Sequence, residues 1–184
     1  MSSHIDQAPV IAGAEAWSHN GTKRVGALCI HGFTGNPSSM RGVAQAFAAA
    51  GYDVELPRLP GHGTAVSDMI PSRWSDWSFE VAAAYARLAA RVDKVVVAGL
   101  SMGGSLTLWT ALQQPSVSGI VCINPASQPQ AEEMIEMVKG MLAEGTEVFP
   151  GIGSDIADPD VKESSYSETP LAPLVSMVED GIKP

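Results

Sequence analysis

The sequence predicts an α/β fold, a mostly parallel β-sheet with helices flanking both of its faces. Short apolar runs alternate with longer segments of helical periodicity from Arg24 to Asn124, which is the pattern of a parallel sheet buried on both sides. Of the 184 residues, 45% are hydrophobic and 17% are charged. This composition is typical of one globular domain with a substantial core, and it argues against a disordered or fibrous chain.

Four strands are expected in succession. Residues 25–30 are almost wholly apolar and end at His31-Gly32, and residues 52–57 form the next strand. Residues 94–100 are the clearest strand because three consecutive valines favour extended backbone. Residues 119–124 form a fourth short apolar strand, so the strands together supply a parallel sheet.

Helices are expected between these strands. One begins at Ser38 or Ser39, whose hydroxyl group can cap a helix. A second covers about residues 71–92 and turns Phe79, Leu88 and several alanines toward the core. A third covers residues 102–114. Each would pack on one face of the sheet.

The alternation of strands and helices stops after the fourth strand. Residues 131–143 form an amphipathic helix in which methionines alternate with acidic residues, a short apolar helix follows at 171–178, and no further strand is expected. We therefore divide the chain into residues 1–126, the N-terminal part of the core, and residues 127–184, a helical cap.

Charge and hydropathy exclude several classes of function. A formal net charge of -9 disfavours nucleic acid as a partner. No transmembrane segment and no secretory leader is recognised, so we expect a cytoplasmic protein. Cys29 and Cys122 lie within predicted strands, which suits buried free thiols rather than a disulfide or a metal site.

The motif Gly99-Leu-Ser101-Met-Gly103 predicts a catalytic serine. It fits G-x-S-x-G and lies between the clearest strand and a helix, the context in which this motif forms a strained turn that exposes the serine hydroxyl group. The N–H group of Met102 would then point toward a developing oxyanion. The alternative is a glycine-rich turn that contains an incidental serine.

A second motif agrees with the first. His31-Gly-Phe-Thr-Gly35 follows the first predicted strand, where a serine hydrolase needs a loop whose backbone N–H group completes the oxyanion hole. Phe33 would donate that N–H group. Without the serine motif, a simple turn before a helix would explain these residues.

Together with Leu59-Pro-Gly-His-Gly63, these motifs resemble the bacterial carboxylesterases and monoacylglycerol lipases of the α/β-hydrolase fold. The resemblance implies an ester substrate, a Ser-His-Asp triad, an oxyanion hole formed by Phe33 and Met102, and a cap above an acyl pocket. It implies no metal and no organic cofactor.

The cap helix supplies the expected substrate-binding residues. Methionine is an adaptable lining for an acyl chain, and the residues expected to contact the chain are Met134, Met137, Val138 and Met141. These side chains could equally pack the cap onto the sheet, and the sequence leaves both interpretations open.

The triad is incomplete in this sequence. Its histidines, His4, His19, His31 and His62, all precede Ser101, whereas in this fold the acid and the histidine follow the serine. Triads are defined by geometry, so His31 and His62 remain alternatives, although the resemblance implies structural hydrogen-bonding roles for both. No residue is nominated as the triad acid.

We therefore expect the C-terminal strands of the fold to be absent from this chain. An unpaired apolar edge strand would promote aggregation, so a second polypeptide, the C-terminal remainder of the same protein, is expected to supply the acid and the histidine. The function expected is a serine carboxylesterase or lipase that acts on monoacylglycerols or short-to-medium acyl esters through an acyl-enzyme. The alternatives are another hydrolase or a perhydrolase of the same fold, and a non-catalytic binding or scaffold protein.

Overall fold

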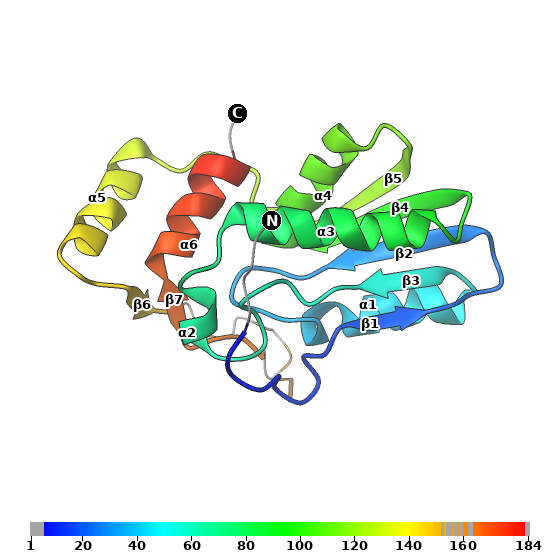
Figure 1. Cartoon of the computed structure of the whole chain (residues 1–184), viewed down its shortest axis with the longest axis horizontal. Helices are drawn as coiled ribbons and strands as arrows, with labels where there is room; N and C mark the ends of the chain where they lie inside the picture. Colours follow the sequence, from blue (N-terminus) through cyan, green and yellow to red (C-terminus); the bar gives the residue numbers. More distant parts are fainter. Residues whose placement is uncertain are drawn as a thin grey trace.

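The computed structural model describes residues 6–151, 153, 156, 158, 160–161 and 164–182, so His4 lies outside the described residues. Its centre is a five-stranded sheet of order β1-β3-β2-β4-β5, in which β2 to β5 are parallel and β1 is antiparallel to β3 (Figure 1). The strands are β1 (Trp17–His19), β2 (Val25–Ile30), β3 (Asp53–Leu56), β4 (Lys94–Leu100) and β5 (Val117–Ile123). The four predicted strands are confirmed.

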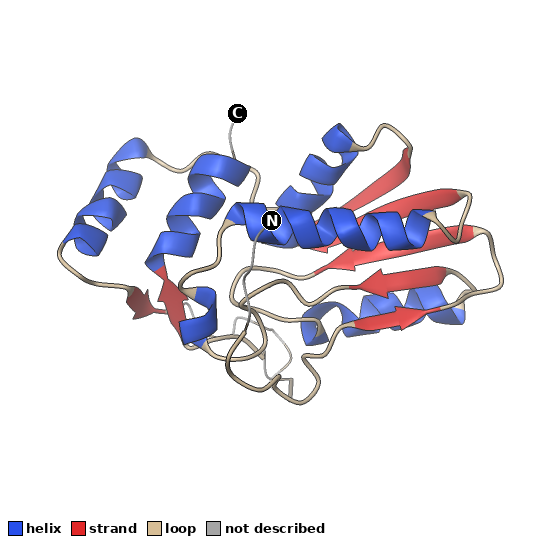
Figure 2. Cartoon of the chain, in the orientation of Figure 1, coloured by secondary structure: helices blue, strands red, loops and turns tan. Residues whose placement is uncertain are grey.

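Helices cover both faces of this sheet (Figure 2). They are α1 (Ser38–Ala49), α3 (Trp74–Ala89) and α4 (Met102–Gln113), whereas the short α2 (Val66–Met69) lies off the end of the strands. Alternate side chains of a strand point to opposite faces, so Leu28 and Ile30 join the core cluster under α3 and α4, while Cys29 joins the cluster under α1. Both layers of core are therefore built from the same central strands.

The described part of residues 127–182, the C-terminal segment, lies off the carboxyl ends of the parallel strands (Figure 1). Its elements are α5 (Glu132–Ala143), β6 (Val148–Pro150), β7 (Glu168–Pro170), α6 (Leu171–Ser176) and the π-helical turn η1 (Met177–Gly181). Ligands of open parallel sheets bind at this end of the strands. The segment is therefore in a position to cover a site there.

Three local predictions were wrong. Leu88 is buried as predicted, but Phe79 is 62% exposed, because α3 buries a stripe that also contains Trp77 and Val81. Alanines are compatible with either face and gave no direction. Helix α1 is not capped by a serine side chain: the Asn36 Oδ1 atom accepts the N–H group of Ser38 at 3.0 Å. Strands do occur after β5, but β6 and β7 have three residues each, too few for a periodic signal.

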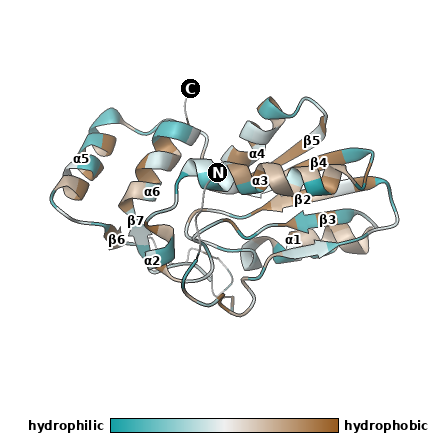
Figure 3. Ribbon diagram, viewed as in Figure 1, coloured by the Kyte–Doolittle hydropathy of each residue, from teal (hydrophilic) through white to brown (hydrophobic). Residues whose placement is uncertain are grey.

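Strand β5 is an edge of the sheet, and its apolar side chains are exposed. Ile120, Val121 and Ile123 are exposed to solvent, as is Leu112 on the neighbouring helix α4, and β5 is coloured hydrophobic in Figure 3. An exposed apolar edge strand is a site for pairing with another strand.

No helix among the described residues has the length and apolarity needed to cross a bilayer.

Candidate active site

Ser101 occupies a strained turn between β4 and α4. Its backbone has φ = 55° and ψ = −119°, a conformation that residues with a Cβ atom rarely adopt. The turn is tied to β5 and to the chain that follows it: the Ser101 N–H group donates to the Ile123 carbonyl oxygen at 3.0 Å, and the Ala126 N–H group donates to the Ser101 carbonyl oxygen at 3.2 Å. The predicted serine therefore lies in a strained turn between a parallel strand and the helix that follows it.

The glycines on either side of Ser101 are required by close backbone approach. A Cβ atom on Gly99 would lie 2.0 Å from the Gly103 carbonyl oxygen, and a Cβ atom on Gly103 would lie 2.2 Å from the Ile30 carbonyl oxygen. Neither distance is compatible with a side chain. The G-x-S-x-G spacing is thus the condition for packing α4 against the end of β2.

The loop that follows β2 passes beside the Ser101 side chain. A Cβ atom built on Gly32 would lie 3.8 Å from the Ser101 Oγ atom. Phe33 is the next residue, and its ring packs edge-on against Trp77 at a centroid distance of 5.8 Å. Met102 begins α4, where backbone N–H groups lack acceptors within the helix. Of the two predicted oxyanion donors, Met102 therefore directly follows Ser101, and Phe33 lies in the loop that passes beside it.

His31 is engaged in backbone hydrogen bonds through both ring nitrogens. The Leu59 N–H group donates to the His31 Nε2 atom at 3.1 Å, and the Nδ1 atom lies 3.0 Å from the Gly32 carbonyl oxygen. Because Nε2 accepts, the proton belongs on Nδ1, which donates. Burial, together with the neighbouring His62, holds the pKa of His31 well below its ordinary value. A ring in this state links two loops and has no lone pair left for the serine proton.

The other described histidines also lie in structural surroundings. His62 is fully buried, its Nδ1 atom lies 3.0 Å from the Pro60 carbonyl oxygen, and its ring packs edge-on against Trp77. His19 lies on β1, at the edge of the sheet opposite β5. Within the described part of the chain, no histidine is hydrogen-bonded to the Ser101 hydroxyl group.

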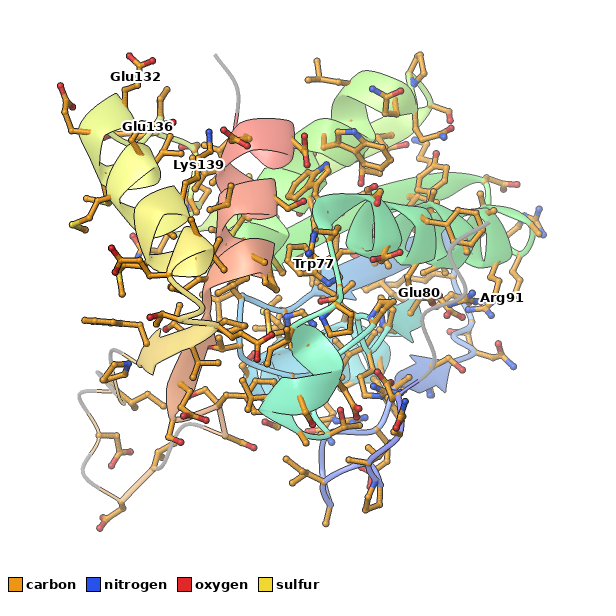
Figure 4. All side chains as sticks on the ribbon, turned by 60° about the vertical axis from the view of Figure 1, so that its left-hand side comes forward. Trp77, Glu80, Arg91, Glu132, Glu136 and Lys139 are labelled. Atoms are coloured by element: carbon orange, nitrogen blue, oxygen red, sulfur yellow. The ribbon has the colours of Figure 1, made fainter. Side chains whose placement is uncertain are left out.

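An apolar pocket of about 230 Å³ opens between α5 on one side and α6 with η1 on the other. Its wall includes Ala126, the residue whose N–H group contacts the Ser101 backbone. The Lys139 Nζ atom on α5 pairs with Glu179 on η1 at 2.7 Å. Figure 4 shows Lys139 between α5 and the neighbouring C-terminal helix. The pocket thus lies mainly within the C-terminal segment and reaches the core at Ala126, while Ser101 itself is not among its lining residues.

Two of the four predicted acyl-contacting residues line this pocket. Met134 and Val138 do so, together with Ile135 of the same helix. Met137 is 61% exposed, and neither it nor Met141 is among the residues that line the pocket. The face of α5 that meets the pocket is therefore rotated from the one that methionine content alone would select.

Ala126 and Tyr166 belong to the site but were not predicted from the sequence. Ala126 follows Asn124-Pro125. Its contact with Ser101 could be predicted only by knowing that β5 ends beside the Ser101 turn. Tyr166 reaches the two loops around the serine from the far end of the sequence. A lone tyrosine within a polar stretch gave no periodic signal for either contact.

Comparison with known proteins agrees with this geometry. Residues 28–150 match the family model of the alpha/beta hydrolase fold. The chain is similar to a thermostable monoacylglycerol lipase of Bacillus sp. (strain H-257), with 45% identity over 94% of this chain and 67% of the relative. It is also similar to a carboxylesterase of Bacillus subtilis (strain 168), with 28% identity over 82% of this chain and 60% of the relative. The chain thus spans about two thirds of the length of these relatives.

Solved structures show the same architecture. A structure of the metagenome-derived lipolytic enzymes LipS and LipT matches with a TM-score of 0.87 and 41% identity, over 94% of this chain and 70% of that one. The monoacylglycerol lipase of Paleococcus ferrophilus, at 17% identity, shares the fold with a TM-score of 0.60 over 91% of this chain and 70% of that one. The family match and the relative from Bacillus sp. (strain H-257) show that this chain belongs to the α/β-hydrolase family, within its carboxylesterases and monoacylglycerol lipases.

Proposed function

We propose that Ser101 is the nucleophile of a carboxylic ester hydrolase that acts on monoacylglycerols or on short-to-medium acyl esters. The observation that carries the proposal is the strained Ser101 turn, placed beside the Gly32-Phe33 loop and next to an apolar pocket. A strained serine at the end of a parallel strand costs stability, and such strain occurs mostly at functional sites. The relatives named above are lipolytic enzymes, which supports the same reaction class.

In the proposed reaction, the Ser101 Oγ atom attacks the ester carbonyl carbon. A histidine takes the serine proton, and the N–H groups of Phe33 and Met102 stabilise the oxyanion. The tetrahedral intermediate collapses, the alcohol leaves with the proton from the histidine, and the acyl group stays on Ser101. Water, deprotonated by the same histidine, then attacks the acyl-enzyme. The bond between the acyl carbon and the Ser101 Oγ atom breaks, the histidine returns its proton to Oγ, and the acid is released.

We propose that the histidine and the acid come from outside residues 1–184. Both ring nitrogens of His31 are engaged in backbone hydrogen bonds, and this chain leaves about a third of the length of the relatives unmatched. The exposed apolar strand β5 is where a further strand would extend the sheet. A second polypeptide, the C-terminal remainder of the same protein, is the proposed source.

The proposal also assigns the two parts of the chain. Residues 1–126 would form the core, and residues 127–184 would form a cap whose Met134 and Val138 contact the acyl chain. The absence of a histidine bonded to Ser101 among the described residues favours a second candidate, a binding or scaffold protein without hydrolytic activity. A cytoplasmic location remains a prediction.

Fluorophosphonate labelling followed by denaturing intact-mass spectrometry separates these candidates. We expect Ser101 to be labelled in the presence of the second polypeptide and the Ser101→Ala variant to remain unlabelled. A panel of 1-monoacylglycerols of increasing chain length then tests the pocket. If a sample that contains every proposed component is neither labelled nor active on esters, the hydrolase proposal is wrong and the binding role is favoured.

A further inference from the structure

Tyr166 joins the C-terminal segment to two loops of the core. Its N–H group donates to the Thr34 carbonyl oxygen at 3.1 Å, and its hydroxyl group donates to the Gly61 carbonyl oxygen at 2.9 Å. The Thr64 N–H group donates to the same hydroxyl oxygen at 3.0 Å. One residue therefore makes hydrogen bonds with both the loop after β2 and the loop after β3.

The loop after β2 needs such support. Thr34 is β-branched and has φ = 59°, a conformation that is strained for this residue type. Thr34 immediately follows Phe33, the proposed oxyanion donor. The Thr34 carbonyl group is held from outside the loop by Tyr166, so the geometry of this loop depends on a contact with the C-terminal segment.

The loop after β3 is coupled to the same place. Its Leu59 N–H group donates to His31, so displacement of this loop would also disturb the start of the loop after β2, which contains Phe33 and is here called the oxyanion loop. A second link lies beside Tyr166: the Asn36 Nδ2 atom donates to the Ser164 Oγ atom at 2.9 Å. Burial raises the pKa of Tyr166, which keeps its hydroxyl group protonated and able to donate.

We propose that Tyr166 is a positioning residue for ester hydrolysis: its hydroxyl group locks residues 164–170 to the Gly61–Thr64 loop and thereby holds Phe33 where its N–H group meets the oxyanion. This inference rests on the proposed function of Ser101. Tyr166 itself does not touch the reacting atoms. Its effect should therefore appear in kcat, because the oxyanion exists only in the transition state and the intermediate.

The test compares Tyr166→Phe with Tyr85→Phe. Tyr85 is a matched control because its hydroxyl group also makes a side-chain hydrogen bond, at 2.8 Å to Ser116, on α3 and away from the oxyanion loop. Activity is measured on the complete protein per fluorophosphonate-titrated serine. For Tyr166→Phe we expect kcat to fall about five- to tenfold, the factor that corresponds to a net hydrogen bond, with KM changed less than twofold. For Tyr85→Phe we expect unchanged kcat.

Amide hydrogen exchange of residue 166 provides a readout that does not need activity. If the hydroxyl group locks the segment, the amide that donates to Thr34 should exchange about fivefold faster in Tyr166→Phe and at the wild-type rate in Tyr85→Phe. Ser164→Ala removes one of the two Ser164 acceptors of the Asn36 Nδ2 atom and keeps the backbone carbonyl oxygen. It should therefore accelerate the same amide less than Tyr166→Phe does, and it serves if Tyr166→Phe does not fold.

The two proposals fail in distinguishable ways. A wild-type protein that hydrolyses no ester refutes the proposed function, while hydrogen exchange still decides whether Tyr166 positions the loop. Unchanged exchange at residue 166, or equal kcat in Tyr166→Phe and wild type, overturns the positioning role. Equal losses of kcat in both tyrosine variants would also overturn it, since they would reflect general destabilisation.

Discussion

Replacing Ser101 with glycine is expected to stabilise the protein while removing its proposed nucleophile. The Ser101 backbone, at φ = 55° and ψ = −119°, lies in a region that costs a residue with a side chain about 1–3 kcal/mol. Glycine adopts this conformation without the steric cost, but it loses about 0.5–1 kcal/mol in conformational entropy. The balance is a stabilisation of about 1 kcal/mol, which corresponds to a rise in Tm of about 2–4 °C for a protein of this size.

The matched control is Ser101→Ala, which removes the hydroxyl group and keeps the Cβ atom. Thermal and urea denaturation of both variants, followed by circular dichroism, should give a free energy of unfolding that is higher for glycine than for alanine by about 1 kcal/mol. Neither variant should react with a fluorophosphonate. If Ser101→Gly is no more stable than Ser101→Ala, the turn does not store strain and the main argument for a functional serine is lost.

Four further predictions follow from the space around two glycines and from the burial of two side chains. Gly103→Ala should destabilise the protein by more than about 3 kcal/mol or prevent folding, because the new Cβ atom meets the Ile30 carbonyl oxygen at 2.2 Å. Gly42→Ala on α1, with nothing within 4 Å of its Cβ position, should instead raise the free energy of unfolding by about 0.5–1 kcal/mol in the same denaturation assay. Burial lowers the pKa of His31 below the ordinary 6.5, so in acid the unfolded chain binds more protons than the folded one. The free energy of unfolding should therefore be highest above about pH 6.5 and fall as the pH drops below it, and it should depend less on pH in His31→Gln. Burial raises the pKa of the Cys29 thiol to about 12, so it should resist a thiol reagent at pH 8 in the native protein and react after unfolding, and rapid native reaction would contradict its buried position.

Local regularities made much of the core predictable. The valines of residues 94–100 specify β4 through their own backbone preference, and the apolar run of residues 25–30 specifies β2. The Gly99–Gly103 motif was interpretable because its neighbours along the chain are a strand and a helix. Each of these signals lies within about ten residues, where spacing and side-chain type directly restrict the backbone.

Long-range packing decided what those signals could not. Phe79 faces solvent because α3 turns Trp77 toward Phe33 and His62, a choice made by the partners and not by the periodicity of a helix rich in alanine. Met134 was separated from Met137 in the same way, since only the position of α6 determines which side of α5 meets a pocket. Amphipathic patterns define a stripe, while its exact orientation depends on the surface that it meets.

The amino-acid sequence by itself therefore predicted a parallel α/β core, a serine in a strained turn and the family to which the chain belongs. Folding alone brought Ala126 beside Ser101, assigned both nitrogens of His31 to the backbone and placed Tyr166 between two loops. The physical reason is that hydrogen bonds and contacts between distant segments depend on the packing of whole elements, which no local pattern of residues encodes.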